Sequence, residues 1–203
     1  VGIEEIVKER LNVKSTIGNN FKYEIIQQWN PGIMGICEAY NKGAEKAKHE
    51  NLLFIHEDVL FETKDWGNIL INYLHLNNVG CIGLAGANYI PHTPTPWWVI
   101  EGYANSHLSH FNKKTNKRHD YTFETKENGL LNSKIIDGVF LACRKNVWNV
   151  VKFNEHLTGF HGYDVNFSLA LSQIKQNYIL NKINIVHFSH GTLSKDWLKD
   201  LID

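Results

Sequence analysis

A continuous apolar run at residues 52–55 is the feature that most constrains how this chain folds. The sequence Leu-Leu-Phe-Ile lacks the alternation of a half-buried strand, and it is typical of a strand buried on both faces. A similar short run follows at residues 80–84, and residues 65–76 between them place apolar side chains at helical spacing. Strands that alternate with helices predict an α/β fold with a mostly parallel central sheet and helices on both of its faces.

The rest of the chain continues this pattern around one long irregular segment. We predict further helices at residues 1–11, 33–48, 145–151, 164–175 and 194–202, a turn at residues 30–32, and further strands at residues 23–27, 135–143 and 183–188. Residues 86–131 have poor periodicity and clustered prolines, which predicts a long insertion with irregular strands. A length of 203 residues fits a single domain over residues 1–203.

Charge, apolar runs and cysteine content limit the binding partners and the cellular location that we expect. Lys plus Arg equals Asp plus Glu at 21 each, which gives no general attraction to nucleic acid or to an anionic membrane. The sequence contains no run of about 18 apolar residues, so we expect no transmembrane segment. The three cysteines are scattered and odd in number, which argues against a disulfide framework and favours a reducing, cytoplasmic location.

The first candidate site is His56-Glu57-Asp58, where the apolar run ends. Open α/β sheets bind ligands beyond the carboxyl ends of their strands. Side chains two residues apart in an extended segment point the same way, so His56 and Asp58 are expected to face a common point. An imidazole and a carboxylate suit Mn²⁺ or Zn²⁺. The alternative is that His56 caps the strand and Asp58 begins a turn.

Two later segments carry further candidates. Residues 159–164 place His161 between two glycines and put Asp164 at the start of a predicted helix. Asp164 is either a helix N-cap or a base that takes a proton from an acceptor hydroxyl. After the last predicted strand, either His187 or His190 would complete a metal site, and a structural role is the alternative for each.

The insertion holds two features with open interpretations. Trp97 and Trp98 follow a proline-rich loop, where indole faces would stack on a sugar acceptor or pack in the core. The basic run at residues 113–119 would contact an anionic acceptor or a membrane headgroup, or it would form a solvated loop.

In this order, these features resemble the family-2-like glycosyltransferases of the GT-A fold, in a bacterial branch whose metal motif has a His-x-Asp form. The resemblance covers five segments. Residues 41–47 match an N-x-G-x-x-x-A helix, residues 54–59 the strand that ends in the metal motif, and residues 137–142 the strand at the floor of the acceptor site. Residues 159–164 with 167–169 match the segment that supplies the base, and residues 187–191 match a late H-x-S-x-G element.

The resemblance implies a Rossmann-like three-layer sandwich that transfers a hexose, with inversion, from a nucleotide-diphosphate donor to a hydroxyl. A UDP-sugar is the favoured donor, and a carbohydrate or glycoconjugate is the acceptor. Mn²⁺ or Mg²⁺ is the implied cofactor, bound by Asp58 with His56 beside it and His187 as third ligand. Asp164 is the implied base. The residues expected to contact donor or acceptor are Asn41, Trp97, Trp98, Asp137, Gly138 and His161.

Such an enzyme would act in polysaccharide or glycoconjugate assembly in the cytoplasm, with peripheral contact to the inner membrane as a further expectation. Two departures from the family pattern stand out. The family begins with a buried strand that has no clear equivalent here, and Tyr163 stands where the family often has Glu. The missing strand favours one alternative, a non-catalytic nucleotide-sugar or sugar-binding module. A second alternative is a zinc hydrolase built on His56, Asp58 and His187.

Overall fold

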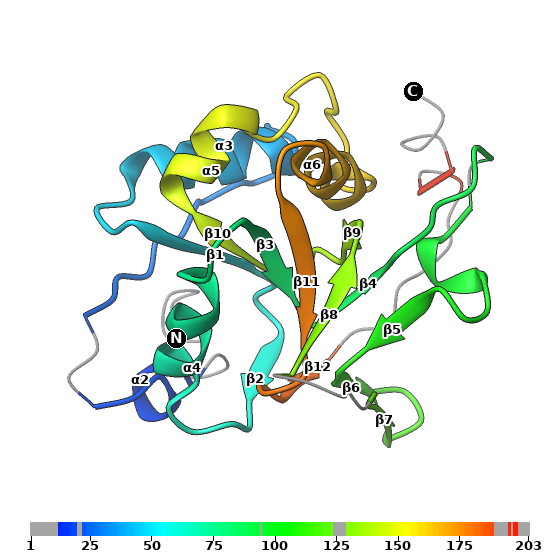
Figure 1. The fold of residues 1–203 in the computed structure, drawn as a ribbon, viewed down its shortest axis with the longest axis horizontal. Helices are drawn as coiled ribbons and strands as arrows, with labels where there is room; N and C mark the ends of the chain where they lie inside the picture. The colour runs from blue at the N-terminus through cyan, green and yellow to red at the C-terminus, as the bar shows by residue number, and fades with distance from the viewer. Residues whose placement is uncertain are drawn as a thin grey trace.

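The computed structural model describes residues 12–19, 22–93, 95–123, 129–188, 195 and 197–198. A five-stranded sheet forms the centre of this part of the chain (Figure 1). Its strands, in spatial order, are β1 (Asn51–Ile55), β10 (Phe140–Arg144), β3 (Val79–Gly83), β11 (Gln176–Leu180) and β8 (Leu130–Ser133).

The central sheet is mixed rather than mostly parallel, which corrects the expectation from the sequence. β10 lies between β1 and β3 and is antiparallel to both, while β11 is parallel to β3 and antiparallel to β8. β1, β3 and β11 therefore share one direction. The sequence pattern located β10 but did not show its partners, and its direction is seen only in its pairing with β1 and β3.

Helices cover both faces of the central sheet, as predicted. α3 (Ile36–Lys46), α5 (Lys145–Val151) and α6 (Tyr163–Ser172) lie on one face, and α4 (Trp66–Leu74) lies on the other (Figure 1). Side chains alternate along β10, so this strand contributes to the hydrophobic clusters on both faces of the sheet. Leu141 and Cys143 pack in the cluster with α3, α5 and α6, whereas Phe140 and Ala142 pack in the cluster with α4.

Two smaller sheets stand beside the central one. The four-stranded sheet has the order β2 (Val59–Phe61), β12 (Ile185–His187), β6 (Leu108–Asn112) and β7 (Lys117–Tyr121). The three-stranded sheet has the order β5 (Ala104–Ser106), β4 (Ala85–Ala87) and β9 (Ile135–Ile136), with the short helix η1 (Trp97–Val99) between β4 and β5 in the chain. The predicted strand near residue 185 thus joins the four-stranded sheet.

Several expectations differ in detail. Residues 23–27 form no strand, and the short helix α2 (Val13–Thr16) precedes them. The predicted turn is present, since the Asn30 side chain accepts hydrogen bonds from the backbone N–H groups of residues 32–34. The predicted helix at residues 1–11 lies outside the described residues, as does most of the helix at residues 194–202, of which residues 195, 197 and 198 are helical.

β11 is a central strand that the sequence did not reveal, because it begins with Gln176 and Asn177. The Asn177 side chain is fully buried and is satisfied by backbone groups: it accepts from the N–H of Cys81 and donates to the carbonyls of Ser168 and Lys134. These hydrogen bonds remove the cost of burying an amide in the sheet. A polar residue therefore occupies a core position that a search for apolar runs does not find.

Candidate functional site

The end of β1 brings His56 to the junction of the central and four-stranded sheets. The backbone N–H of His56 donates to the carbonyl of Val139, 3.3 Å away. Residues 57 and 58 then form a turn, after which β2 enters the four-stranded sheet. Asp58 therefore reaches the same region as His56 through a turn, and not through the extended segment expected from the sequence.

The pairing of β2 with β12 supplies the third member of the site. Val59 lies opposite His187 in the antiparallel ladder, and the N–H of Phe188 donates to the carbonyl of Asp58 at 2.9 Å. This register places the His187 side chain beside Asp58. The other candidate, His190, lies outside the described residues.

The three side chains form a compact cluster with two short contacts. Nε2 of His187 is 3.2 Å from Oδ1 of Asp58 and 3.4 Å from Nδ1 of His56. One ligand atom from each residue can be chosen so that all lie within 4.8 Å of one another. His187 is 7% exposed, and its Nδ1 is buried with no hydrogen-bond partner among the described residues.

The donor set and its spacing fit a divalent metal ion. Ligands at about 2.0–2.2 Å from a tetrahedral or octahedral metal lie about 3.0–3.6 Å from their neighbours, which includes both short contacts of His187. Burial lowers the pKa of His56, and a hydrogen bond from His187 lowers the pKa of Asp58. Both shifts favour a neutral imidazole and an ionised carboxylate, the forms that bind metals.

The loop at residues 137–139 connects this cluster to Asp137 and Asp164. The Asp137 carboxylate accepts from the N–H of Val139 at 2.9 Å and from the indole N–H of Trp97 at 3.2 Å. The Asp164 carboxylate accepts from the N–H groups of Gly138 and Val165, at 2.8 and 2.9 Å. One loop therefore carries Asp137, binds the Asp164 carboxylate and accepts the backbone N–H of His56.

Asp164 is not the N-cap of α6. That position is Gly162, whose φ of 73° lies in the left-handed region, and the helix begins at Tyr163. Burial raises the pKa of Asp164 to about 7, and repulsion from Asp137 adds to the effect. A carboxyl with this pKa can exchange a proton near neutral pH.

The two tryptophans of the insertion have different environments. Trp97 is 7% exposed and packs in the core, with its N–H on Asp137. Trp98 is 44% exposed and meets Trp97 edge to face, with ring centroids 5.4 Å apart. His161 is half-buried in the loop before α6, two residues from Tyr163.

The Asn41 side chain hydrogen-bonds to residues outside the His56–Asp58–His187 cluster. It is 3% exposed, and its amide donates to the Phe153 carbonyl and to Glu155. Its oxygen accepts from the indole N–H of Trp148 and the N–H of Phe153. Both ends of the amide are thus occupied within the protein, so the side chain ties α3 to the end of α5.

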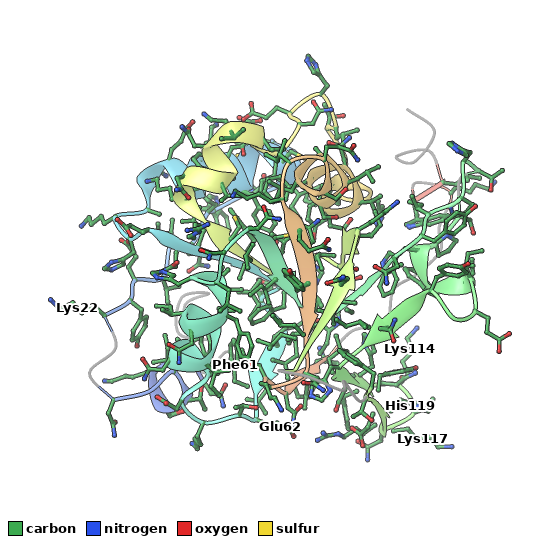
Figure 2. All side chains as sticks on the ribbon, in the orientation of Figure 1. Lys22, Phe61, Glu62, Lys114, Lys117 and His119 are labelled. Carbon is green, nitrogen blue, oxygen red and sulfur yellow. The ribbon has the colours of Figure 1, made fainter. Side chains whose placement is uncertain are left out.

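The basic run of the insertion forms the β6–β7 hairpin. Arg118 is held in a two-pronged ion pair with Glu62, at 2.6 and 2.9 Å, and also contacts Asp120. Figure 2 shows Lys114, Lys117 and His119 on this hairpin, and all three are exposed. The arginine is therefore engaged within the protein, while the lysines form a solvated tip.

Two residues near the cluster were given no role by the sequence. Oη of Tyr163 lies 3.1 Å from Nε2 of His56. His110 lies opposite His187 in the parallel β6–β12 pair, with ring centroids 5.3 Å apart. The departure from the family pattern at Tyr163 was the only sequence signal for the first, and the second required the strand register.

The sequence of residues 7–198 matches the model of a family described as glycosyltransferase like, and the chain belongs to this family. Among solved structures it is similar to GalNAc-T7, crystallised with UDP, GalNAc and Mn²⁺, with a TM-score of 0.58 and 12% identity over 85% of this chain and 34% of that chain. The chain thus spans about a third of the length of GalNAc-T7. The expected GT-A-like α/β fold is confirmed by this likeness and by the layers described above.

A second solved structure, A197 from STIV, has a TM-score of 0.48 and 17% identity over 91% of this chain and 80% of that chain. A search of curated proteins found no match. Within the described residues, no helix is long and apolar enough to cross a membrane.

Proposed function

We propose that this chain transfers a sugar from a nucleotide-diphosphate donor to a hydroxyl acceptor, using a divalent metal held by His56, Asp58 and His187. The observation that carries the proposal is the cluster itself, whose three ligand atoms lie within 4.8 Å of one another. It follows the end of β1, where open α/β sheets bind ligands. Membership of the glycosyltransferase like family supports sugar transfer over zinc-dependent hydrolysis.

A UDP-sugar and Mn²⁺ are the favoured donor and ion, because the GalNAc-T7 structure contains UDP, GalNAc and Mn²⁺. When bound, the metal supplies positive charge that neutralises the diphosphate leaving group. Asp58 and His56 both contact Nε2 of His187, at 3.2 and 3.4 Å. On this proposal, the diphosphate binds beside these three residues.

Asp164 is the proposed base. The acceptor oxygen attacks the anomeric carbon, the bond from that carbon to the diphosphate oxygen breaks, and the acceptor proton passes to the Asp164 carboxylate. This single displacement inverts the anomeric configuration. The raised pKa of Asp164, about 7, suits proton transfer at neutral pH. Gly138 donates its N–H to Asp164, so we assign it to holding the base.

The acceptor side is proposed to include Asp137, Trp98 and His161. Trp97 fixes Asp137 through its indole N–H and supports Trp98 edge to face. The exposed face of Trp98 would stack on an acceptor sugar. A role in polysaccharide or glycoconjugate assembly in the cytoplasm, with contact to the inner membrane, remains a prediction, as does the single domain over residues 1–203.

Titration calorimetry with UDP and with GDP, in Mn²⁺ and then in EDTA, tests the proposal. We expect saturable binding of one nucleotide in Mn²⁺ and its loss in EDTA. Binding that is unchanged in EDTA would remove the metal from the mechanism. A donor-hydrolysis assay with and without carbohydrate acceptors then separates a transferase from a binding module, since the module consumes no donor under either condition.

A further inference from the structure

We propose that Tyr89 and Tyr103 form a sugar-binding platform beside Trp98, and that the acceptor is a neutral oligosaccharide that contacts both places. The inference rests on the proposed function, because it names the class of acceptor that the same site takes. Three observations carry it: the exposure of these aromatic side chains, their connection to Asp137, and the near absence of charge around them.

The two tyrosines lie together at the protein surface. Tyr89 is 44% exposed and Tyr103 is 49% exposed, and their ring centroids are 5.3 Å apart. The ring planes are inclined at 48°, so the rings are not stacked face to face and each keeps ring surface open to solvent. Exposed apolar groups that gather in one place mark binding sites, whereas single ones are ordinary.

Backbone hydrogen bonds hold this pair at the end of the β4–β5 ladder. The N–H of Asn88 donates to the carbonyl of Tyr103 at 3.0 Å, and the N–H of Tyr103 donates to the carbonyl of Ile100 at 3.2 Å. The second bond closes a turn that contains Gly102, whose φ of 80° lies in the left-handed region. Because the backbone is fixed on both sides of Tyr103, little backbone entropy is lost when a ligand stacks on its ring.

The proposed acceptor site and the aromatic side chains are connected through Asp137. The indole N–H of Trp97 donates to the Asp137 carboxylate at 3.2 Å, and the N–H of Asp137 donates to the carbonyl of Ala85 at 2.9 Å. One residue of the site is therefore bonded both to η1, which carries Trp98, and to β4, which leads to Tyr89. The platform is thus continuous with the site through backbone and side-chain hydrogen bonds.

Trp98 and the tyrosine pair are separate platforms. Within the part of the chain that the structure describes, the Trp98 ring meets Trp97, with centroids 5.4 Å apart, and has no ring contact with Tyr89 or Tyr103. We assign one sugar residue to each platform. The acceptor that uses the whole surface is therefore a chain of at least two sugar residues.

The lack of charge on this surface favours a neutral sugar chain. Residues 85–106 contain a single charged side chain, Glu101, and no Lys or Arg. A phosphorylated or uronic acid chain finds no lysine or arginine in this segment. A pyranose presents apolar C–H groups on its faces and hydroxyls at its rim. These groups match the aromatic rings and the amide of Asn88, an exposed neighbour of Tyr89.

The test compares Tyr103→Ala and Tyr89→Ala with Tyr121→Ala. Tyr121 is a matched control because it is also 49% exposed and also has a ring contact, with His110, but it lies on β7. Titration calorimetry is done in EDTA and again in Mn²⁺ with UDP. The probes are maltotetraose, cellotetraose and chitotetraose, each with its monosaccharide, and tetragalacturonate as the charged comparison. We expect at least one neutral tetrasaccharide to bind more tightly than its monosaccharide.

For that tetrasaccharide, Tyr103→Ala and Tyr89→Ala should each bind about tenfold more weakly, whereas Tyr121→Ala should bind as the wild type does. Equal affinities of Tyr103→Ala and Tyr121→Ala would overturn the inference. So would equal affinity for monosaccharide and tetrasaccharide, tighter binding of tetragalacturonate, or no binding of any tetrasaccharide in either condition. If UDP does not bind in Mn²⁺, the proposed function fails, while the titrations in EDTA still decide whether the platform exists.

Discussion

Oδ1 of Asp58 lies 3.2 Å from Nε2 of His187, although Asp58 lies between β1 and β2 and His187 ends the last strand, β12. The ladder between β2 and β12 creates this contact, because Val59 and His187 are directly opposite in it. His56 then joins from the end of β1. The proposed metal site is therefore located where the chain leaves β1 of the central sheet and enters β2 of the four-stranded sheet.

Replacing Asp58 by Asn should abolish metal-dependent nucleotide binding. The amide keeps the size of the carboxylate but loses the charge that binds a divalent cation. We expect at least a roughly 100-fold loss of Mn²⁺-dependent nucleotide affinity in calorimetry. Glu57→Gln is the control, since Glu57 is the exposed neighbour and should bind as the wild type does. Equal binding by Asp58→Asn and Glu57→Gln would contradict the ligand assignment.

Asp164→Asn should separate binding from chemistry. Asp164 lies outside the His56–Asp58–His187 cluster, so metal-dependent donor binding should be retained. Turnover should fall by about 10²–10⁴-fold because the variant has no base. The measurement is release of the nucleotide diphosphate with acceptor present. A variant that turns over normally would exclude Asp164 as the base.

The raised pKa of Asp164 also predicts how stability depends on pH in the metal-free chain. Its folded pKa of about 7 exceeds the ordinary value of 3.8, so the folded state holds the proton more tightly than the unfolded chain does. The stabilisation is complete below the lower value and is lost as pH rises through about 7.

Urea unfolding of the wild type and of Asp164→Asn between about pH 5 and pH 8, both in EDTA, measures this effect. The free energy of unfolding of the wild type should fall relative to the variant as pH rises. The comparison of slopes excludes any constant change in hydrogen bonding that the substitution causes. Parallel curves for the two proteins would show that the Asp164 carboxyl is not perturbed.

The two tryptophans should respond differently to truncation. Trp97→Ala removes a buried side chain and should cost about 3–5 kcal/mol of unfolding free energy. Trp98→Ala removes an exposed one and should change stability by less than about 0.5 kcal/mol. If Trp98 stacks on the acceptor, its loss should raise the KM for the acceptor without changing donor affinity. An unchanged acceptor KM would show that Trp98 does not contact the acceptor.

Local patterns in the sequence predicted many of the elements. The apolar run at residues 52–55 is β1, and the predicted helix at residues 145–151 coincides with α5. His56 and Asp58 were singled out because they follow a buried strand, a feature visible in a short window of sequence. Their meeting with His187 depends on a long-range strand pairing. The place of His187 and His190 at the last predicted strand made both candidates, and the family resemblance favoured His187.

Features that depend on long-range partners were not predictable in the same way. The direction of β10 depends on its pairing with β1 and β3. Asn177 enters the core only because Cys81, Ser168 and Lys134 supply hydrogen bonds. Asn41 matched a family pattern, yet its amide binds Phe153 and Glu155. A polar residue in a sequence does not show whether its partner is a ligand or the protein itself.

The most direct test of the metal assignment is anomalous X-ray diffraction, recorded at the manganese edge from a crystal of the chain soaked in Mn²⁺. We predict one strong anomalous peak within about 2.0–2.3 Å of the Asp58 carboxylate and of an imidazole nitrogen of both His56 and His187. No peak among these three side chains at saturating Mn²⁺ would contradict the metal site and the transfer mechanism built on it.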